Sequence, residues 1–600
     1  MNTAAEQIPA TKPQRRSFLL CILFLLCALL WNPEIYYIWQ LKFTYLPFFT
    51  VGALAFLALG IIVQAAPEFR PLRKFMLIAG IAFFLVVLGQ ILTHASGLTL
   101  ARIGEALLWI VIPALAYTHY QSFRKLLPVY VLVLGSYDFL YFIVGNLRIA
   151  WSPGITGNIN WTAALVVMTM IFLGWHIRER FTRSQSAKQR KKILGFGIAG
   201  ELLLGCQLWK IGSKGAFLAA GATALLFIFL RSSARIRKIL IGLMLLGLLA
   251  GSFWAMKHTD SISRFINDDG RVIFWENAVA LIADHPLFGV GQSSFENEYM
   301  RYRKADYFFT LNPAARSNHP HNHLLFMAGS WGLIGLILWG ILLFAPLAVM
   351  IRKYYRHETV DPLETACFLT LCYAFLHGSL DIIMFTMPTG LIALLCLGML
   401  WRNLSDPDKP AVSIPGRAAK TAVTAVNMLL AVLIVWTGCF ADLQVRRAYR
   451  NELTADEIVR TARTCPGEYQ SNFALLNYLL KHGESAAVLA VTDVMLKSHT
   501  PNYPGVHMGR GNALMRLGRF GEALENYRVE AELFPLTLRP VYNMIVAARA
   551  MKDPALAAKL ETELRERMRI RGCDDRALKI ILMGKLGAHY DLRVRDIPED

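Results

Sequence analysis

The stretch SNHPHNHLLFMAGSWGLIG, residues 317–335, joins a histidine-rich segment directly to an apolar run. His319, His321 and His323 stand at every second position, and the apolar run continues to about residue 351. A run of that length is sufficient for a helix that crosses a bilayer. Three interpretations of the histidines remain open at this point. They are a metal site, a general base, and the polar edge at which a loop enters the membrane.

The composition extends the membrane assignment to most of the chain. Of the 600 residues, 55% are hydrophobic and 17% are charged, whereas soluble domains have about 45–50% and about 25%. We therefore predict an all-α, polytopic membrane protein with about 13 transmembrane helices. The predicted spans are 17–38, 43–66, 75–96, 103–120, 126–146, 159–176, 193–209, 215–230, 239–256, 324–351, 365–385, 386–401 and 421–440.

The net charge of +20 is distributed as a topology signal. Most of the Lys and Arg excess lies in alternate short loops, such as 178–192 and 231–238, and this pattern does not indicate nucleic-acid binding. The positive-inside rule places residues 1–16 in the cytoplasm and the chain after 440 on the opposite, periplasmic side. The loop 257–323 then faces the periplasm. Since no cleavage site is evident near residue 31, we expect the first span to be retained.

The tail, residues 441–600, has balanced charge and helical periodicity. Its segment ALMRLGRFGEALENYRVEAELFP is typical of a tetratricopeptide helix pair, with Gly518 at the turn, Ala523 at the helix crossing and Pro535 at the stop. We predict a periplasmic helical-repeat domain that binds a partner; an ordinary helical domain is the alternative. Of nine cysteines, Cys465 and Cys573 lie in this tail and could form a disulfide.

Basic residues beside the apolar runs are candidate ligands of phosphate. Arg271 opens an expected amphipathic helix in DGRVIFWENAVALIADHPLFGVGQSSFENEY, residues 269–299, and Lys214 stands at the mouth of a span, one turn after Lys210. A guanidinium binds phosphate in a bidentate manner, and an ammonium binds it as a point charge. The alternative is that these side chains extend to lipid headgroups. No Walker-type loop supports nucleotide use.

Three asparagines lie at or just before the starts of predicted spans. Asn158 and Asn160 lie in GITGNINWTAAL, and Asn322 precedes the span that begins near 324. Each could cap a helix or line a polar cavity. Asn322 could also orient the neighbouring His321.

Four motifs in this order resemble the O-antigen ligase superfamily of membrane glycan transferases. They are GITGNINWTAAL, SKGAFLA, GRVIFWENAVALIADHPLFGVGQSSFENEY and HPHNHLLFMAGSWGLIG. The superfamily includes lipopolysaccharide O-antigen ligases, protein O-oligosaccharyltransferases and O-antigen polymerases. The resemblance covers roughly residues 20–440 and implies a GT-C-like membrane domain over 17–440.

The resemblance implies transfer of a glycan from undecaprenyl diphosphate to an acceptor hydroxyl at the periplasmic face of a bacterial inner membrane, without a metal or other cofactor. His321 then corresponds to the general base, with His319 as its alternative. Arg271 and Lys214 correspond to diphosphate-binding positions, although the family usually has Arg at the second. Lipid A-core, a protein or a growing glycan are the candidate acceptors. A transporter or repeat-bearing scaffold in the membrane is the non-enzymatic alternative.

Overall fold

The computed structural model describes most of the chain and is helical in nearly all of it. The described residues are 12–29, 46–64, 70–93, 100–148, 154–257, 271–302, 319–406, 408–410, 416–466, 469–497, 505–534 and 537–570. Extended pairing within them is confined to an isolated bridge between Leu72 and Ser405. The predicted all-α class is therefore confirmed.

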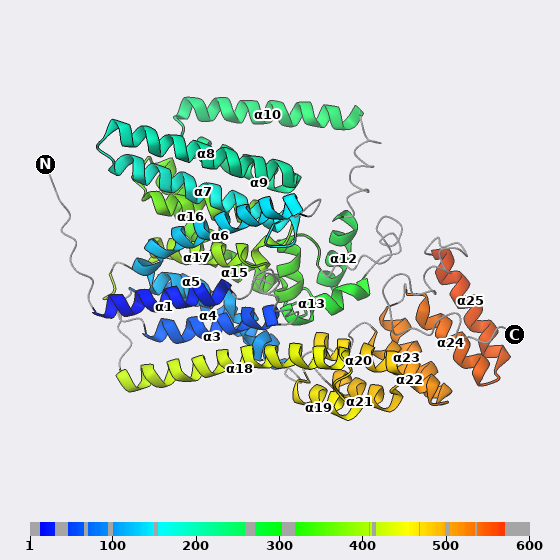
Figure 1. Cartoon of the computed structure of the whole chain (residues 1–600). Coiled ribbons are helices and arrows are strands. Elements are labelled where there is room, and N and C mark those ends of the chain that lie inside the picture. The colour runs from blue at the N-terminus through cyan, green and yellow to red at the C-terminus, as the bar shows by residue number, and fades with distance from the viewer. Residues whose placement is uncertain are drawn as a thin grey trace.

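Each predicted span overlaps one helix of a large bundle (Figure 1). Eight helices in the described residues are long and apolar enough to cross a membrane. The bundle helices are α1 (Lys12–Leu29), α3 (Leu46–Gln64), α4 (Lys74–Thr93), α5 (Leu100–Thr118), α6 (Tyr120–Arg148), α7 (Ile159–Arg183), α8 (Ala187–Ile211), α9 (Lys214–Arg231), α10 (Ala234–Lys257), α15 (His323–Tyr355), α16 (Pro362–Gly378), α17 (Thr389–Trp401) and α18 (Arg417–Tyr449).

The boundaries differ most from prediction between α16 and α17. The span predicted over 365–385 ends at Gly378, and a turn with the short 3-10 helix η2 (Ile383–Phe385) follows. Thr386 and Thr389 donate hydrogen bonds to the backbone oxygen of Ile383, at 3.1 and 2.7 Å between the oxygens. Non-helical backbone in a membrane bundle needs such internal partners because lipid offers none.

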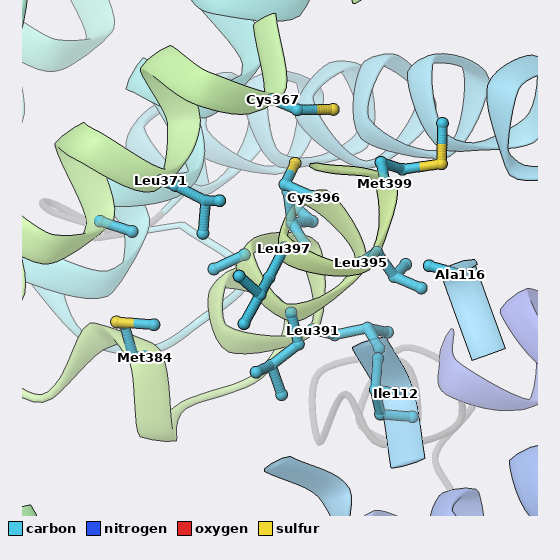
Figure 2. Close-up of a cluster of buried hydrophobic side chains, with 14 of the residues drawn as sticks. Ile112, Ala116, Cys367, Leu371, Met384, Leu391, Leu395, Cys396, Leu397 and Met399 are labelled. Atoms are coloured by element: carbon cyan, nitrogen blue, oxygen red, sulfur yellow. The ribbon is translucent and has the colours of Figure 1, made fainter. Parts of the chain in front are cut away.

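The core lies around α17, in which all 13 residues are buried. A helix that is apolar on every side is stable only when other helices surround it. Figure 2 shows Leu391 and Leu395 of α17 beside Ile112 and Ala116 of α5. Gly398 permits this approach, since a Cβ there would lie 2.1 Å from the backbone oxygen of Pro113. The surface apolar side chains of the outer helices, such as α8 and α10, are consistent with contact to lipid.

The helix α15 is broken near its start at Gly332, which has φ +68° and ψ 178°. That region of backbone space is essentially restricted to glycine. The loop between α12 (Arg271–Asp284) and α13 (Gln292–Tyr299) fills the break. The amides of Val290 and Gly291 donate to the oxygens of Gly329 and Ser330, both at 2.9 Å. The segment around Gly332 and the segment around Gly289 and Gly291, which we call the two glycine motifs, therefore interlock.

The interlock is tight enough to exclude side chains from both motifs. A Cβ on Gly332 would lie 2.1 Å from the backbone oxygen of Leu287, and one on Gly289 would lie 2.4 Å from that of Gly329. The amide of Leu333 donates to the oxygen of Pro286 at 2.8 Å. The break thus fixes the α12–α13 pair against α15.

The helix α18 continues without interruption past Phe440, where we expected the membrane domain to end. It leads into an array of α19 (Ala455–Thr464), α20 (Tyr469–His482), α21 (Ser485–Leu496), α22 (Val506–Arg516), α23 (Phe520–Leu533), α24 (Arg539–Ala550) and α25 (Pro554–Ile570). The array, yellow to red in Figure 1, lies beyond one end of the bundle.

Consecutive helices of the array pack on one another around two apolar clusters. Gly518 has φ +71° in the turn between α22 and α23, and Ala523 is fully buried. Pro535 and Cys573 lie outside the described residues, so the helix stop remains a prediction and the pairing of Cys465 with Cys573 remains open.

We predict that G332A destabilises the bundle strongly. The strained backbone alone costs an alanine roughly 1–3 kcal/mol, and its Cβ would also overlap the backbone of Leu287. Thermal unfolding of the detergent-solubilised protein measures the effect. G221A in α9 is the control, because a Cβ there meets nothing within 4 Å. Equal melting temperatures of the two variants would contradict the proposed interlock.

Candidate functional site

The candidate site forms at the end of the bundle where α7, α9, α12 and α15 begin and α16 ends. We name this the site end. Hydrogen bonds tie these termini to one another across long distances in the sequence. Asn160 of α7 contacts both Ser213, which precedes α9, and Asp381, which follows α16. His321, which precedes α15, faces Asp381.

Asp381 is the centre of this arrangement and was not among the predicted site residues. Its side chain is 1% exposed. It accepts a hydrogen bond from Asn160 Nδ2 at 2.7 Å and another from the backbone amide of Ile382 at 2.7 Å. His321 Nδ1 lies 3.6 Å from Asp381 Oδ1. Since all three partners offer N–H groups, they favour the ionised carboxylate.

His321 occupies an unusual backbone conformation that aims its ring at Asp381. It is a non-glycine residue with φ +50°. Its amide donates to His319 Nδ1 at 3.4 Å, which supports this turn. The ring also packs on Phe274 of α12, with centroids 5.3 Å apart. With Nδ1 directed at the carboxylate, Nε2 is the nitrogen left to accept a proton.

The three histidines have different surroundings. His319 packs against His321, with ring centroids 4.3 Å apart. His323 is instead fully buried against α16, where a Cβ on Gly378 would lie 1.9 Å from its Nδ1. His323 therefore does not share a face with the other two. Among the residues that the structure describes, no group of three or more His, Cys, Asp or Glu side chains is arranged to hold a metal ion.

Loss of solvent around the ring lowers the pKa of His319 to about 3, and His321 adds to this effect while Asp381 opposes it. His319 is therefore neutral at neutral pH. Its Nδ1 accepts the amide hydrogen bond from His321, which is a structural role. This arrangement favours His321 over His319 as the group that takes up a proton.

Asn322 and Asn158 both cap helices. Asn322 Oδ1 accepts from the amides of Leu324 and Leu325 at the start of α15, and its Nδ2 donates to the oxygen of Ser379 at 2.9 Å. Asn158 caps α7 in the same way, through Asn160 and Trp161. Asn160 instead links the polar groups of the site. The predicted capping is thus present at Asn158 and Asn322, whereas Asn160 joins Ser213 to Asp381.

The predicted basic residues differ in how closely they join this cluster. Arg271 is the first residue of α12 and acts electrostatically on His377, which Asp381 also influences. Lys214 is exposed at the start of α9, and the next residue, Gly215, lies against the His377 ring. His377 thus connects Arg271, the start of α9 and Asp381. Lys210 is exposed in the last turn of α8, and the described contacts do not tie it to the cluster.

The site end therefore combines a histidine paired with a carboxylate, two cationic side chains at helix N-termini and a set of amides. Helix N-termini attract anions because their amides point outward and the helix dipole is positive there. This combination can deprotonate a hydroxyl group and bind a phosphate group side by side.

Residues 202–340 match the family model described as O-antigen ligase. Over this segment the chain is similar to the O-antigen ligase family. The match supports glycan transfer in a membrane, of the kind that O-antigen ligases and polymerases carry out. A comparison with curated proteins found no match.

The O-antigen ligase match is narrower than the resemblance over 20–440 that the motifs suggested. It includes Lys210, Lys214, Arg271 and the histidines, but not Asn160 or Asp381. Asp381 lay inside a predicted span, and an acidic residue in such a span is itself a signal of function. The structure joins both residues to the matched segment through Ser213 and His321.

We predict that H319Q reduces the acid sensitivity of folding. A half-buried histidine that stays neutral contributes stability above its unfolded-state pKa near 6.5, and this contribution is lost as pH falls toward about 3. The melting temperature of the wild type should therefore fall more between pH 7.5 and 5 than that of H319Q. Glutamine keeps an acceptor for the His321 amide. An equal fall in both proteins would show that His319 is not the source.

Proposed function

We propose that this protein transfers a glycan from a polyprenyl diphosphate, undecaprenyl diphosphate in bacteria, to an acceptor hydroxyl group. The observation that carries the proposal is the pairing of His321 with buried Asp381 in a cluster that also includes Arg271. The O-antigen ligase match supports the same class of reaction.

The acceptor hydroxyl attacks the anomeric carbon of the donor glycan. A C–O bond forms there, the bond from that carbon to the diphosphate oxygen breaks, and His321 Nε2 takes the hydroxyl proton. Asp381 keeps Nδ1 protonated and stabilises the imidazolium that results. A positioned base of this kind contributes about 10²- to 10⁴-fold to the rate.

The leaving group is polyprenyl diphosphate, which departs with its negative charge. Arg271 and Lys214 stand at the starts of α12 and α9, where both the side chain and the helix N-terminus favour an anion. Lys214 contributes a point charge where the family usually has a guanidinium. We assign Lys210 a weaker role in drawing the donor to this surface.

The acceptor would approach from the site end, which the charge pattern of the sequence places on the periplasmic side of the inner membrane. The helical array after α18 extends from the same end (Figure 1). It could therefore present a protein acceptor or an assembly partner. Comparison of glycoproteins and lipopolysaccharide from a deletion strain distinguishes lipid, protein and glycan acceptors.

We predict that H321A lowers kcat by about 10²- to 10⁴-fold, because the acceptor then loses its base. D381N should lower kcat less, since the histidine remains but its orientation is weakened. The measurement is transfer from purified lipid-linked donor by the full-length protein in lipid nanodiscs.

H285A is the matched control, because His285 is exposed at the end of α12 and belongs to the same α12–α13 region. Its activity should equal that of the wild type. Transfer that survives H321A would refute the proposed mechanism.

We predict that R271A raises the KM for the lipid-linked donor and also lowers kcat, because the diphosphate gains charge as it leaves. R271K should recover part of the loss, because it restores the charge without the planar guanidinium. R301A is the control, since Arg301 is exposed and paired with Glu298. An R271A variant with wild-type kinetics would remove Arg271 from the donor site.

A further inference from the structure

A second buried carboxylate lies beneath the site, on α6. Asp138 is 1% exposed and contacts neither His321 nor Asp381 in the described hydrogen bonds. Its Oδ1 accepts from the backbone amide of Ile155 at 2.8 Å, and its Oδ2 accepts from Gln207 Nε2 at 2.7 Å. An acidic group inside an apolar bundle is costly and calls for an explanation.

The two donors to Asp138 belong to the two segments that carry the partners of the site. Ile155 lies in the loop that leads, five residues later, to Asn160. Gln207 lies on α8, six residues before Ser213. Ser213 Oγ donates to Asn160 Oδ1 at 2.7 Å, and Asn160 then donates to Asp381. One carboxylate therefore anchors both segments.

The loop between Ile155 and Asn160 is held firmly enough to transmit this anchoring. Gly154 has φ +110°, and a Cβ there would lie 2.6 Å from Asp138 Oδ1. The hydroxyls of Thr156 and Thr162 are 2.6 Å apart, and Thr156 also donates to the oxygen of Asn158 at 3.0 Å. A displacement at Ile155 would therefore move the start of α7 and with it Asn160.

We propose that Asp138 is a positioning residue of the glycan-transfer site, which holds Asn160 and Ser213 in register and thereby orients Asp381 toward His321. This inference rests on the proposed function. It adds a residue that lies outside the family match and whose described hydrogen bonds go to Ile155 and Gln207 rather than to His321.

A positioning role for Asp138 predicts an effect on His321 that a general loss of protein stability would not produce. When Asp381 is misaligned, it stabilises the imidazolium form of His321 less, so proton uptake by His321 becomes less favourable. The charged and titratable groups facing this pair are His319 before α15, His377 of α16 and Arg271 of α12. None of them is altered by a change at Asp138.

The test is the pH profile of kcat/KM for D138L in the nanodisc transfer assay. We expect kcat to fall about 10- to 100-fold, the acid limb to move to lower pH by up to about one unit, and the donor KM to change little. D138N should restore the profile. The asparagine oxygen can still accept from the Ile155 amide, and after the Gln207 side-chain amide rotates, the asparagine NH2 can donate to the Gln207 oxygen.

T223V is the control for loss of a buried polar group, because within the described part of the chain Thr223 bonds to the Ala219 oxygen of its own helix and to no other helix. Q207L is the second variant. Its acid limb should move in the same direction by a smaller amount, and it tests the role of Asp138 if D138L does not accumulate. An acid limb that stays in place in D138L or Q207L overturns the role of Asp138. Activity that survives H321A overturns the proposed function itself, so the two failures are distinguishable.

Discussion

The arrangement of the site end depends on one constraint, which is that the buried carboxylate of Asp381 must have N–H partners. A charge removed from water is tolerated only when hydrogen-bond donors surround it. Here the donors come from α7 through Asn160, from the turn after α16 through Ile382, and from the segment before α15 through His321. Segments more than 200 residues apart in the sequence therefore have to meet at one point.

The break at Gly332 determines what else reaches that point. At this break the loop between α12 and α13 packs into α15, and four backbone hydrogen bonds join the loop to the helix. With α12 fixed in this way, Phe274 lies on the His321 ring, and Arg271 stands one turn earlier on the same helix. The glycines of this interlock thus determine where Phe274 and Arg271 lie relative to His321.

Periodicity and charge predicted the spans and the helix that begins at Arg271, because these depend on local sequence. The sequence did not reveal that α15 is broken at Gly332 or that α18 passes Phe440, since both depend on contacts with distant segments. Asp381 and Asp138 were missed for the same reason. Each is a single acid in an apolar run, and only the fold shows that amides from other helices surround it.

A carboxylate next to the proposed diphosphate site would ordinarily repel the proposed donor. In this arrangement both oxygens of Asp381 are occupied by N–H donors, and the side chain is almost completely enclosed. Its charge acts mainly on His321, while Arg271 and the start of α9 offer positive potential toward the donor. The proposed proton acceptor and the proposed anion-binding groups can therefore lie side by side without cancelling each other, and the polar contacts that stabilise this end of the bundle also orient His321.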